Sequence, residues 1–259
     1  MRSLWLPSPG AFLRYHDLAG AWPARLFVHG LGCAGTSDWP HVVALPPLAG
    51  RRSIVPDLLG FGFSDRPRGF GYSMEEHADT LASLLDHLDM RAMPMIGHSM
   101  GGSIAILLAA RRPDLVASLV VAEPNLDPGP GFVSGRIVAS DAETYERSGH
   151  AGLADVFEQA ARLGDDAAAS YVGSFRRADA RALHASAASL IAPRSPTYRA
   201  LLRSLPVPRG YIHGARSQEV VEGLAESGVA IRCVAAAGHG LMDDNPLGFA
   251  EAIASLLAS

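Results

Sequence analysis

Short apolar runs that end near glycine or proline recur along the chain, and they constrain its fold more than any other feature. These runs are ARLFVHG (24–30), RRSIVPDLLG (51–60), MPMIGH (93–98), ASLVVAEPN (117–125), VPRGYIHG (207–214) and VAIRCVAAAG (229–238). Nearly continuous apolar runs of this length are typical of strands that are buried on both faces of a sheet. Helical patterns separate the runs, so we predict an α/β fold with a mostly parallel central sheet flanked by helices.

Two of the predicted helices carry their own start signals. One has leucines at the helical spacing i, i+3, i+4, i+7 from Leu81 onward, behind a capping box formed by Ser73 and Glu76. The C-terminal helix follows Asn245, which can cap it, and Pro246, which suits a first helical turn. These signals support the alternation of strands and helices.

The segment 125–205 interrupts this alternation. It contains helical patches but no good strand, and its nine arginines are matched by nine acidic residues, so it is no basic arm. We predict an α/β core domain made of residues 1–124 and 206–259, with 125–205 inserted as a helical lid. The lid would cover the carboxyl edge of the sheet, where open α/β sheets bind their ligands.

Composition narrows the class of protein. The net charge of −4 gives no reason to expect nucleic acid or an anionic membrane as a partner, and the absence of lysine excludes Schiff-base and Ser-Lys mechanisms. The two cysteines, Cys33 and Cys233, form no disulfide framework and have no metal-ligand spacing. The N-terminal apolar run is too short for a signal peptide, and no run of about 18 apolar residues suggests a membrane span. We expect a cytoplasmic protein without metal or cofactor that takes a small-molecule substrate; homodimerisation stays open.

A polar residue stands between two glycines where a predicted strand meets a predicted helix. The sequence Gly97-His98-Ser99-Met100-Gly101 has the form G-x-S-x-G, and a strand before it with a helix after it is the context of a nucleophile elbow. The turn is so tight that a Cβ at either glycine would collide with neighbouring backbone. Ser99 is therefore the candidate nucleophile, although a serine in an ordinary glycine-rich turn would look similar.

Two further loops supply candidates for a base and for an oxyanion hole. His239 follows the last predicted strand, on the same edge of the sheet as Ser99, and could accept the serine proton; it could also be a surface residue. His-Gly-Leu-Gly follows the first predicted parallel strand, and the amide of Leu31 with that of Met100 could stabilise an oxyanion. A simple strand-ending turn is the alternative. Histidines at other strand ends are expected to pack or to form hydrogen bonds; these are His29, His98 and His213.

The chain resembles the α/β-hydrolase superfamily over essentially its whole length. The resemblance lies in H-G-x-G, in D-x-x-G-x-G-x-S at 57–64, in G-H-S-M-G-G and in the late G-H, in that order. It implies that Asp57 and Ser64 organise a loop near the site. Serine members of the superfamily cleave esters, lactones, thioesters, amides and some C–C bonds without a cofactor. Dehalogenases and epoxide hydrolases of the superfamily carry aspartate at the elbow, so Ser99 argues against both activities.

The acid of the expected triad is missing from its usual place. Most members have G-x-x-D after the strand that corresponds to YIHG, whereas this chain has Gly214-Ala215-Arg216-Ser217, and we interpret Ser217 as a helix cap. Glu123 ends the strand after the elbow helix, where some haloalkane dehalogenases and lactone hydrolases keep their acid. We therefore choose Glu123, which could instead form a salt bridge with an arginine at the lid hinge. Glu219, Asp127 and the absence of any acid remain open.

Together these features predict a serine hydrolase that cleaves a carboxylic ester or lactone through an acyl-enzyme on Ser99. His239 would act as the base, Glu123 would orient it, and Gly97 with Gly101 would form the elbow. Hydrolysis of a C–C bond in a diketone-type compound is the alternative reaction. A different class, a non-catalytic ligand receptor on a hydrolase fold, also remains open, because fold does not imply function.

Overall fold

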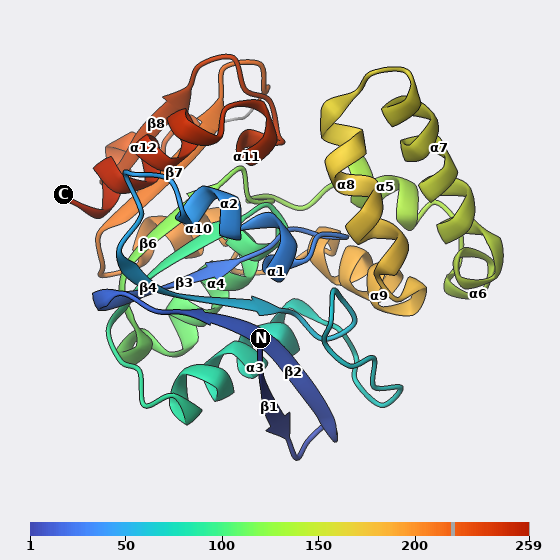
Figure 1. Ribbon diagram of the computed structural model, residues 1–259, viewed down its shortest axis with the longest axis horizontal. Helices are drawn as coiled ribbons and strands as arrows, with labels where there is room; N and C mark the ends of the chain where they lie inside the picture. The colour runs from blue at the N-terminus through green and yellow to red at the C-terminus, as the bar shows by residue number, and fades with distance from the viewer. Residues whose placement is uncertain (219–220, 259) are drawn as a thin grey trace.

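A single eight-stranded sheet forms the centre of the computed structural model, which describes residues 1–218 and 221–258 (Figure 1). The strand order is β1-β2-β4-β3-β5-β6-β7-β8. The strands are β1 (Arg2–Leu6), β2 (Ala11–Leu18), β3 (Ala21–Val28), β4 (Arg51–Asp57), β5 (Met93–His98), β6 (Val116–Ala122), β7 (Arg209–Gly214) and β8 (Val229–Val234). Neighbours from β4 to β8 run parallel, which confirms the predicted mostly parallel sheet.

The two N-terminal strands were not predicted. β1 pairs with β2, and β2 pairs with β4, in antiparallel register at one edge of the sheet. Buried and exposed residues alternate along β1 and through the first half of β2. Strands with one solvated face lack the continuous apolar run of a central strand, which is why a search for such runs passes over them.

Helices cover both faces of the sheet. Successive residues of a strand point to opposite faces, and β3 shows this directly. Leu26 belongs to the buried cluster that includes residues of α3 and α4, whereas Phe27 packs against Trp39, which in turn packs against Phe249 of α12. The helices around the core are α1 (Gly35–Asp38), α2 (Pro40–Val43), α3 (Met74–His87), α4 (Met100–Arg111), η1 (Pro113–Leu115), η3 (Ala225–Ser227), α11 (Leu241–Asp244) and α12 (Pro246–Leu257).

The start signals of two core helices are confirmed. At the start of α3, the Ser73 hydroxyl accepts from the Glu76 amide, and the Glu76 carboxylate accepts in return from the Ser73 amide. The Asn245 side chain accepts from the Gly248 amide at the start of α12, with Pro246 in its first turn. Both helices therefore begin where the sequence places them.

The chain between β6 and β7 is helical. Its elements are α5 (Phe132–Ile137), α6 (Ala142–Thr144), the π-helix η2 (Tyr145–Gly149), α7 (His150–Arg162), α8 (Asp166–Arg177), α9 (Ala180–Ile191) and α10 (Tyr198–Ser204). Helices α5 to α9 lie together at one side of the core (Figure 1), and we call residues 132–191 the cap. In contrast, α10 packs against α4 of the core, although it falls within the segment expected to form the lid.

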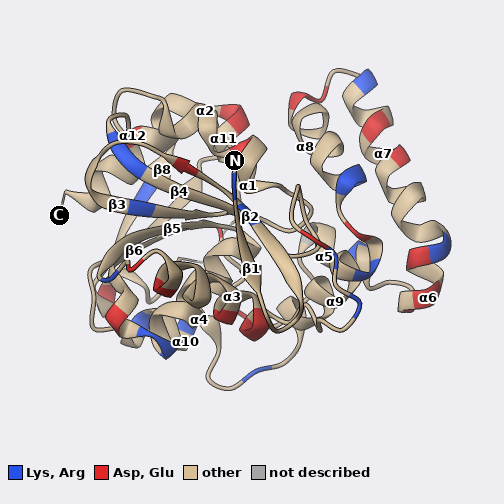
Figure 2. Ribbon diagram, turned by 60° about the horizontal axis from the view of Figure 1, so that its bottom comes forward, with Lys and Arg blue, Asp and Glu red and all other residues tan. Residues whose placement is uncertain are grey.

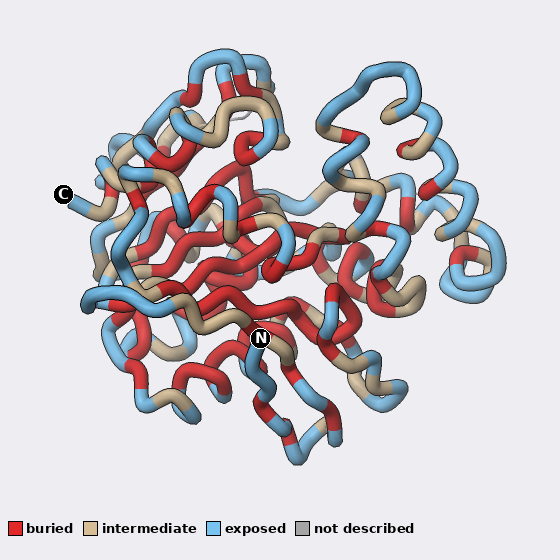
Figure 3. The backbone as a smooth tube through the Cα atoms, viewed as in Figure 1, coloured by how far each residue is buried: buried red, intermediate tan, exposed pale blue. Residues whose placement is uncertain are grey.

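The cap has its own small core. Phe157 of α7 and Phe175 of α8 meet edge to face with ring centroids 5.2 Å apart, and Tyr171 packs against both rings. On the outer surface Arg176 pairs with Asp155 at 2.7 Å, and Figure 2 shows such opposite charges on neighbouring turns of α7 and α8. Exposed ion pairs contribute little free energy, so apolar packing is the main contact between these helices. Residues of the central strands are mostly buried, whereas those of α7 are mostly exposed or half-buried (Figure 3).

None of the helices in the described ranges is both long and apolar enough to span a bilayer.

A buried carboxylate connects the loop after β3 to the loop after β4. Asp57 is fully buried, and its carboxylate accepts from the amides of Thr36 and Phe63, both at 2.8 Å. The Ser64 hydroxyl donates to the Asp57 carbonyl oxygen at 2.5 Å. Gly62 has φ +51°, and a Cβ there would lie 2.2 Å from the Asp57 carboxylate, so only glycine fits. Asp57 and Ser64 thus organise this loop, as the resemblance implies.

Replacing Asp57 by alanine should destabilise the protein strongly. The change leaves the buried Thr36 amide and the partly buried Phe63 amide without an acceptor, and we expect a loss of about 3 kcal/mol in the free energy of unfolding. Urea denaturation of both proteins measures it. Asp79→Ala is the matched control, because the Asp79 side chain is 59% exposed in its pair with Arg111. It should cost less than about 1 kcal/mol. Equal losses in the two variants would contradict the role of Asp57.

Candidate active site

Ser99 occupies a strained turn between β5 and α4. Its backbone has φ 52° and ψ −126°, a conformation that L-residues rarely adopt, and its amide donates to the Ala122 carbonyl at 2.8 Å. A Cβ at Gly97 would lie 2.5 Å from the Gly101 carbonyl oxygen, and one at Gly101 would lie 2.4 Å from the Val28 carbonyl oxygen. Both elbow glycines are therefore required by close backbone approach. Such strain is characteristic of functional turns.

A chain of hydrogen bonds joins three of the residues singled out from the sequence. The Ser99 Oγ lies 3.1 Å from His239 Nε2, and His239 Nδ1 lies 2.7 Å from Glu123 Oε2. The network assigns the tautomer: the carboxylate can only accept, so Nδ1–H donates to Glu123 and Nε2 is left to accept from Ser99. The three residues come from the loops after β5, β8 and β6, which are parallel strands with their carboxyl ends at one edge.

Glu123 is buried and well supplied with donors. The residue is 2% exposed and has φ 45°, and its Oε1 accepts from the Gly214 amide at 2.8 Å while Oε2 faces His239. Burial alone would raise the pKa of Glu123, but the hydrogen bonds from His239 and Gly214, together with the nearby Ser217 hydroxyl, bring that pKa below its ordinary value. The carboxylate is therefore ionised at neutral pH. Within the described residues its side-chain partner is His239 and not an arginine at the lid hinge.

The interpretation of Ser217 as a helix cap is wrong. Ser217 and Gln218 lie outside any helix, and the chain from 222 to 224 forms a turn before the short 3-10 helix η3. The Ser217 hydroxyl is instead buried beside Glu123, close enough to lower its pKa but without the geometry of a hydrogen bond. The vacant acid position thus faces the carboxylate that comes from the neighbouring strand.

Of the other two candidate acids, the structure describes only Asp127, which takes no part in this chain of hydrogen bonds. Asp127 forms an exposed ion pair with Arg199 at 2.7 Å. Glu219 lies outside the described residues. Within the described part of the chain, no group of three or more histidine, cysteine, aspartate or glutamate side chains is arranged to hold a metal ion.

The His-Gly-Leu-Gly loop lies directly against the elbow. A Cβ at Gly30 would lie 3.3 Å from the Ser99 Cβ. His29 holds the loop from below, because its Nδ1–H donates to the Gly30 carbonyl at 2.8 Å and its Nε2 accepts from the Leu58 amide at 3.0 Å. Leu31 follows Gly30 in this loop, and Met100 follows Ser99 as the first residue of α4, so the two candidate oxyanion-hole residues come from the loop after β3 and from the start of α4.

The histidines at strand ends have the hydrogen-bonding roles expected of them. His98 is buried, and its Nε2–H donates to the carbonyl of His239 at 2.8 Å, which anchors the loop that carries His239. Burial, reinforced by the proximity of His239, lowers the pKa of His98 to about 4, so the ring is neutral. His213 contacts the Gly214 carbonyl through Nδ1 at 3.2 Å. The sequence gives no sign that His98 supports the His239 loop, 141 residues away.

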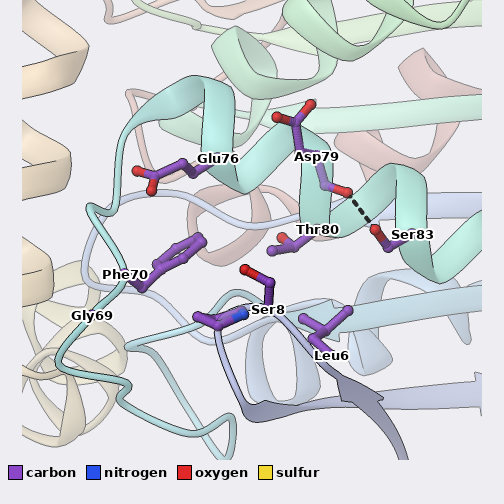
Figure 4. A pocket seen from close by; sticks show the side chains of 9 residues that line it. Leu6, Ser8, Gly69, Phe70, Glu76, Asp79, Thr80 and Ser83 are labelled. Carbon is purple, nitrogen blue, oxygen red and sulfur yellow. Dashed lines mark hydrogen bonds between the residues drawn. The ribbon is translucent and has the colours of Figure 1, made fainter.

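A hollow of about 210 Å³ on the surface lies apart from these residues, and Figure 4 shows it in close view. Its polar groups are already committed to structure. Glu76 caps α3, Asp79 pairs with Arg111, and the Ser83 hydroxyl donates to the Asp79 carbonyl (Figure 4). It brings no nucleophile to a base, so the candidate active site is the elbow and not this hollow. The lining residues are Leu6, Ser8, Pro9, Gly69, Phe70, Glu76, Asp79, Thr80 and Ser83.

Glu123→Gln should destabilise the protein more at neutral than at acid pH. Because the folded-state pKa of Glu123 lies below the ordinary value of 4.5, the ionised group stabilises the fold above that value. This contribution is lost as the pH falls through the lower folded-state pKa. We expect a deficit of about 2 kcal/mol at pH 7 that shrinks toward about pH 3, measured by urea unfolding across this range. A deficit that stays constant or grows in acid would contradict the assignment.

Comparison with solved structures supports the architecture. An esterase from Thermogutta terrifontis has a TM-score of 0.82 and 25% identity, with 100% of this chain and 98% of that chain covered. An enol-lactonase from Burkholderia xenovorans LB400 has a TM-score of 0.78 and 23% identity, with 96% of this chain and 98% of that chain covered. At 23% identity, the match to the enol-lactonase shows a shared fold and nothing more.

Comparison at the level of sequence gives the family. The chain is 38% identical over 108 residues to 2-hydroxymuconate semialdehyde hydrolase of Pseudomonas sp. (strain CF600). That match covers 41% of this chain and spans only 38% of the length of the relative. The family model of the alpha/beta hydrolase fold matches residues 24–194. This match covers well over half of the chain, and the protein therefore belongs to the α/β hydrolase fold family.

Proposed function

We propose that the protein is a serine hydrolase that cleaves a carboxylic ester or a lactone through an acyl-enzyme on Ser99. The observation that carries the proposal is the unbroken chain of hydrogen bonds from Ser99 through His239 to the buried Glu123. A serine hydroxyl is a weak nucleophile until a neighbouring base takes its proton. An ionised carboxylate on the far nitrogen of that base keeps the right tautomer and stabilises the imidazolium that forms.

In the acylation step, Ser99 Oγ attacks the substrate carbonyl carbon while its proton passes to His239 Nε2. The carbonyl electrons move onto oxygen, and the amides of Leu31 and Met100 stabilise the resulting oxyanion. The Met100 amide lies at the N-terminus of α4, whose dipole favours negative charge. The tetrahedral intermediate then collapses: the C–O bond to the leaving group breaks, and His239 returns the proton to the departing alkoxide.

Deacylation repeats these steps with water as the nucleophile. His239 removes a proton from water as the oxygen of that water adds to the acyl carbon. The bond to Ser99 Oγ then breaks while His239 returns the proton to that oxygen, which releases a carboxylic acid. With a lactone the leaving alcohol remains on the same molecule, so the product is a hydroxy acid. The route needs no cofactor and no metal.

We favour esters and lactones as substrates, but a separate observation supports hydrolysis of a C–C bond. The solved esterase aligns with the whole of this chain at 25% identity, which supports ester hydrolysis. The similarity to the semialdehyde hydrolase, at 38% identity over a shorter stretch, keeps hydrolysis of a C–C bond as the second candidate. Both reactions use an activated nucleophile and an oxyanion hole, so only assays with each class of substrate can distinguish them.

The proposal includes a small-molecule substrate and a cytoplasmic location. Cys33 and Cys233 are both free thiols, with Cys33 half-buried and Cys233 exposed. Free thiols suit a reducing compartment, where disulfides rarely persist. The helices 132–191 would act as the lid over the site.

Ser99→Ala should lower kcat for p-nitrophenyl esters or lactones by about 10³-fold or more, since the oxyanion hole and substrate binding alone leave only a residual rate. A fluorophosphonate probe should label wild-type protein on Ser99 and leave the variant unlabelled. Ser83→Ala is the matched control, because the Ser83 hydroxyl only donates to a helix carbonyl, and it should keep full activity and labelling. Circular dichroism checks that each variant is folded.

The outcomes separate the candidates. Undiminished activity in Ser99→Ala would mean that another nucleophile reacts. Folded wild-type protein that no probe labels would favour a ligand receptor over an enzyme. Turnover of a vinylogous diketone, with esters and lactones left intact, would assign the C–C reaction instead.

A further inference from the structure

One face of the cap helix α8 is turned toward the loops of the candidate active site. Residues 167, 171 and 174 are spaced for a single helix face. A Cβ at Gly240, next to His239, would lie 3.7 Å from the Ala167 Cβ. The Ser174 hydroxyl lies 3.1 Å from that of Ser37 in α1. Both ends of this face of α8 therefore contact loops or helices beside the candidate active site.

Tyr171 makes the central contact of this face. Its hydroxyl donates to the Leu31 carbonyl oxygen at 2.8 Å, which joins the cap to the His-Gly-Leu-Gly loop. Tyr171 comes so close to the loop that the residue after Leu31 must be glycine. Gly32 has φ +76°, and a Cβ there would lie 2.3 Å from the Tyr171 hydroxyl oxygen and 2.7 Å from Phe175 Cδ2. The loop and α8 are therefore in tight contact at this point.

The Tyr171 ring is held rigidly within the cap. Its centroid lies 5.0 Å from that of Phe157 and 5.4 Å from that of Phe175, so the hydroxyl is presented from a packed aromatic cluster. Burial raises the pKa of Tyr171 well above its ordinary value, with a smaller contribution from the nearby Cys33. The phenol therefore keeps its proton and remains a hydrogen-bond donor at any working pH.

The core and the cap hold different peptides of the loop that receives this contact. Leu31 stands between Gly30 and Gly32, and glycines allow the backbone wide freedom. The turn closes on itself with one bond, from the Cys33 amide to the Gly30 carbonyl, at 3.2 Å. His29 holds the Gly30 carbonyl, whose peptide also carries the Leu31 amide, from the core side. The following peptide, Leu31–Gly32, is held from the cap through the Leu31 carbonyl.

We propose that Tyr171 is a positioning residue: by holding the Leu31–Gly32 peptide it restricts rotation of the backbone at Leu31, and so keeps the amide of the adjoining Gly30–Leu31 peptide facing the oxyanion formed at Ser99. The inference rests on the proposed function. On this proposal the oxyanion hole is complete only while α8 contacts the loop that carries Leu31. The cap then contributes to the chemical step as well as covering the site. A donor displaced by a fraction of an ångström loses much of its benefit to the transition state.

Tyr171→Phe tests this, because it keeps the ring packing and removes only the hydroxyl. We expect kcat for an ester substrate to fall about tenfold with KM changed less than about twofold, the pattern of an interaction that matters in the transition state. A trifluoromethyl ketone, whose adduct with Ser99 carries an oxyanion, should lose affinity by the same factor. A purely structural defect would lower thermal stability without this matched loss.

Tyr145→Phe is the matched control. Tyr145 is a second buried tyrosine of the cap, and its hydroxyl has no hydrogen-bond partner within the described residues. The same substitution there should leave kcat and inhibitor affinity at wild-type values. A similar loss in both variants would show that the cap tolerates no change, and it would overturn a specific role for the Tyr171 hydroxyl.

Two other outcomes would overturn the inference. Wild-type kcat and inhibitor affinity in folded Tyr171→Phe would show that Leu31 needs no support from the cap. A raised KM at constant kcat would make Tyr171 a substrate contact instead. Failure of the proposed function is distinguishable, because wild-type protein would then resist fluorophosphonate labelling at Ser99. Labelled wild type with an unaffected Tyr171 variant would remove this inference alone.

Discussion

The hydrogen bond between Glu123 and His239 is the interaction on which the rest of the site depends. At 2.7 Å it fixes the imidazole tautomer, and thereby points a lone pair toward Ser99. The sheet order makes it possible: β6 lies between β5 and β7, with β8 beyond, so loops distant in sequence share one edge. The Gly214 amide, at the end of β7, holds the other carboxylate oxygen. Four neighbouring strands therefore contribute to one arrangement of three side chains.

Holding these groups is costly for the fold. Ser99 and Glu123 both have positive φ values without being glycine, a strain of about 1–3 kcal/mol for each such residue, and the Glu123 charge is buried. A buried carboxylate is tolerated only when donors replace its water. Here the Gly214 amide and the His239 ring supply them. The same reasoning applies to Asp57, whose donors hold the loop after β4 while a glycine accommodates the close approach.

The parts of the molecule that can be predicted from the sequence are those that local patterns determine. Central strands show as apolar runs, the elbow as glycines around Ser99, and Glu123 as a charge at the end of a buried strand. The N-terminal strands β1 and β2 are missed because buried and solvent-facing residues alternate along them. The contact of Tyr171 with Leu31 joins residues 140 positions apart, and nothing in the composition of α8 indicates which of its residues faces the loop. Ser217 was misread because its burial beside Glu123 follows from tertiary packing and not from a local signal.

Ser99, His239 and Glu123 are expected to act as one catalytic unit. A double-mutant cycle on kcat at Glu123 and His239 measures whether they do. Glu123→Gln should lower kcat by about 10²- to 10⁴-fold, and His239→Asn by at least as much, because residues acting together are strongly non-additive. We expect the double variant to be no slower than His239→Asn alone, since Glu123 acts only through the imidazole. If the two losses multiply in a folded double variant, Glu123 and His239 contribute independently and do not form one catalytic unit.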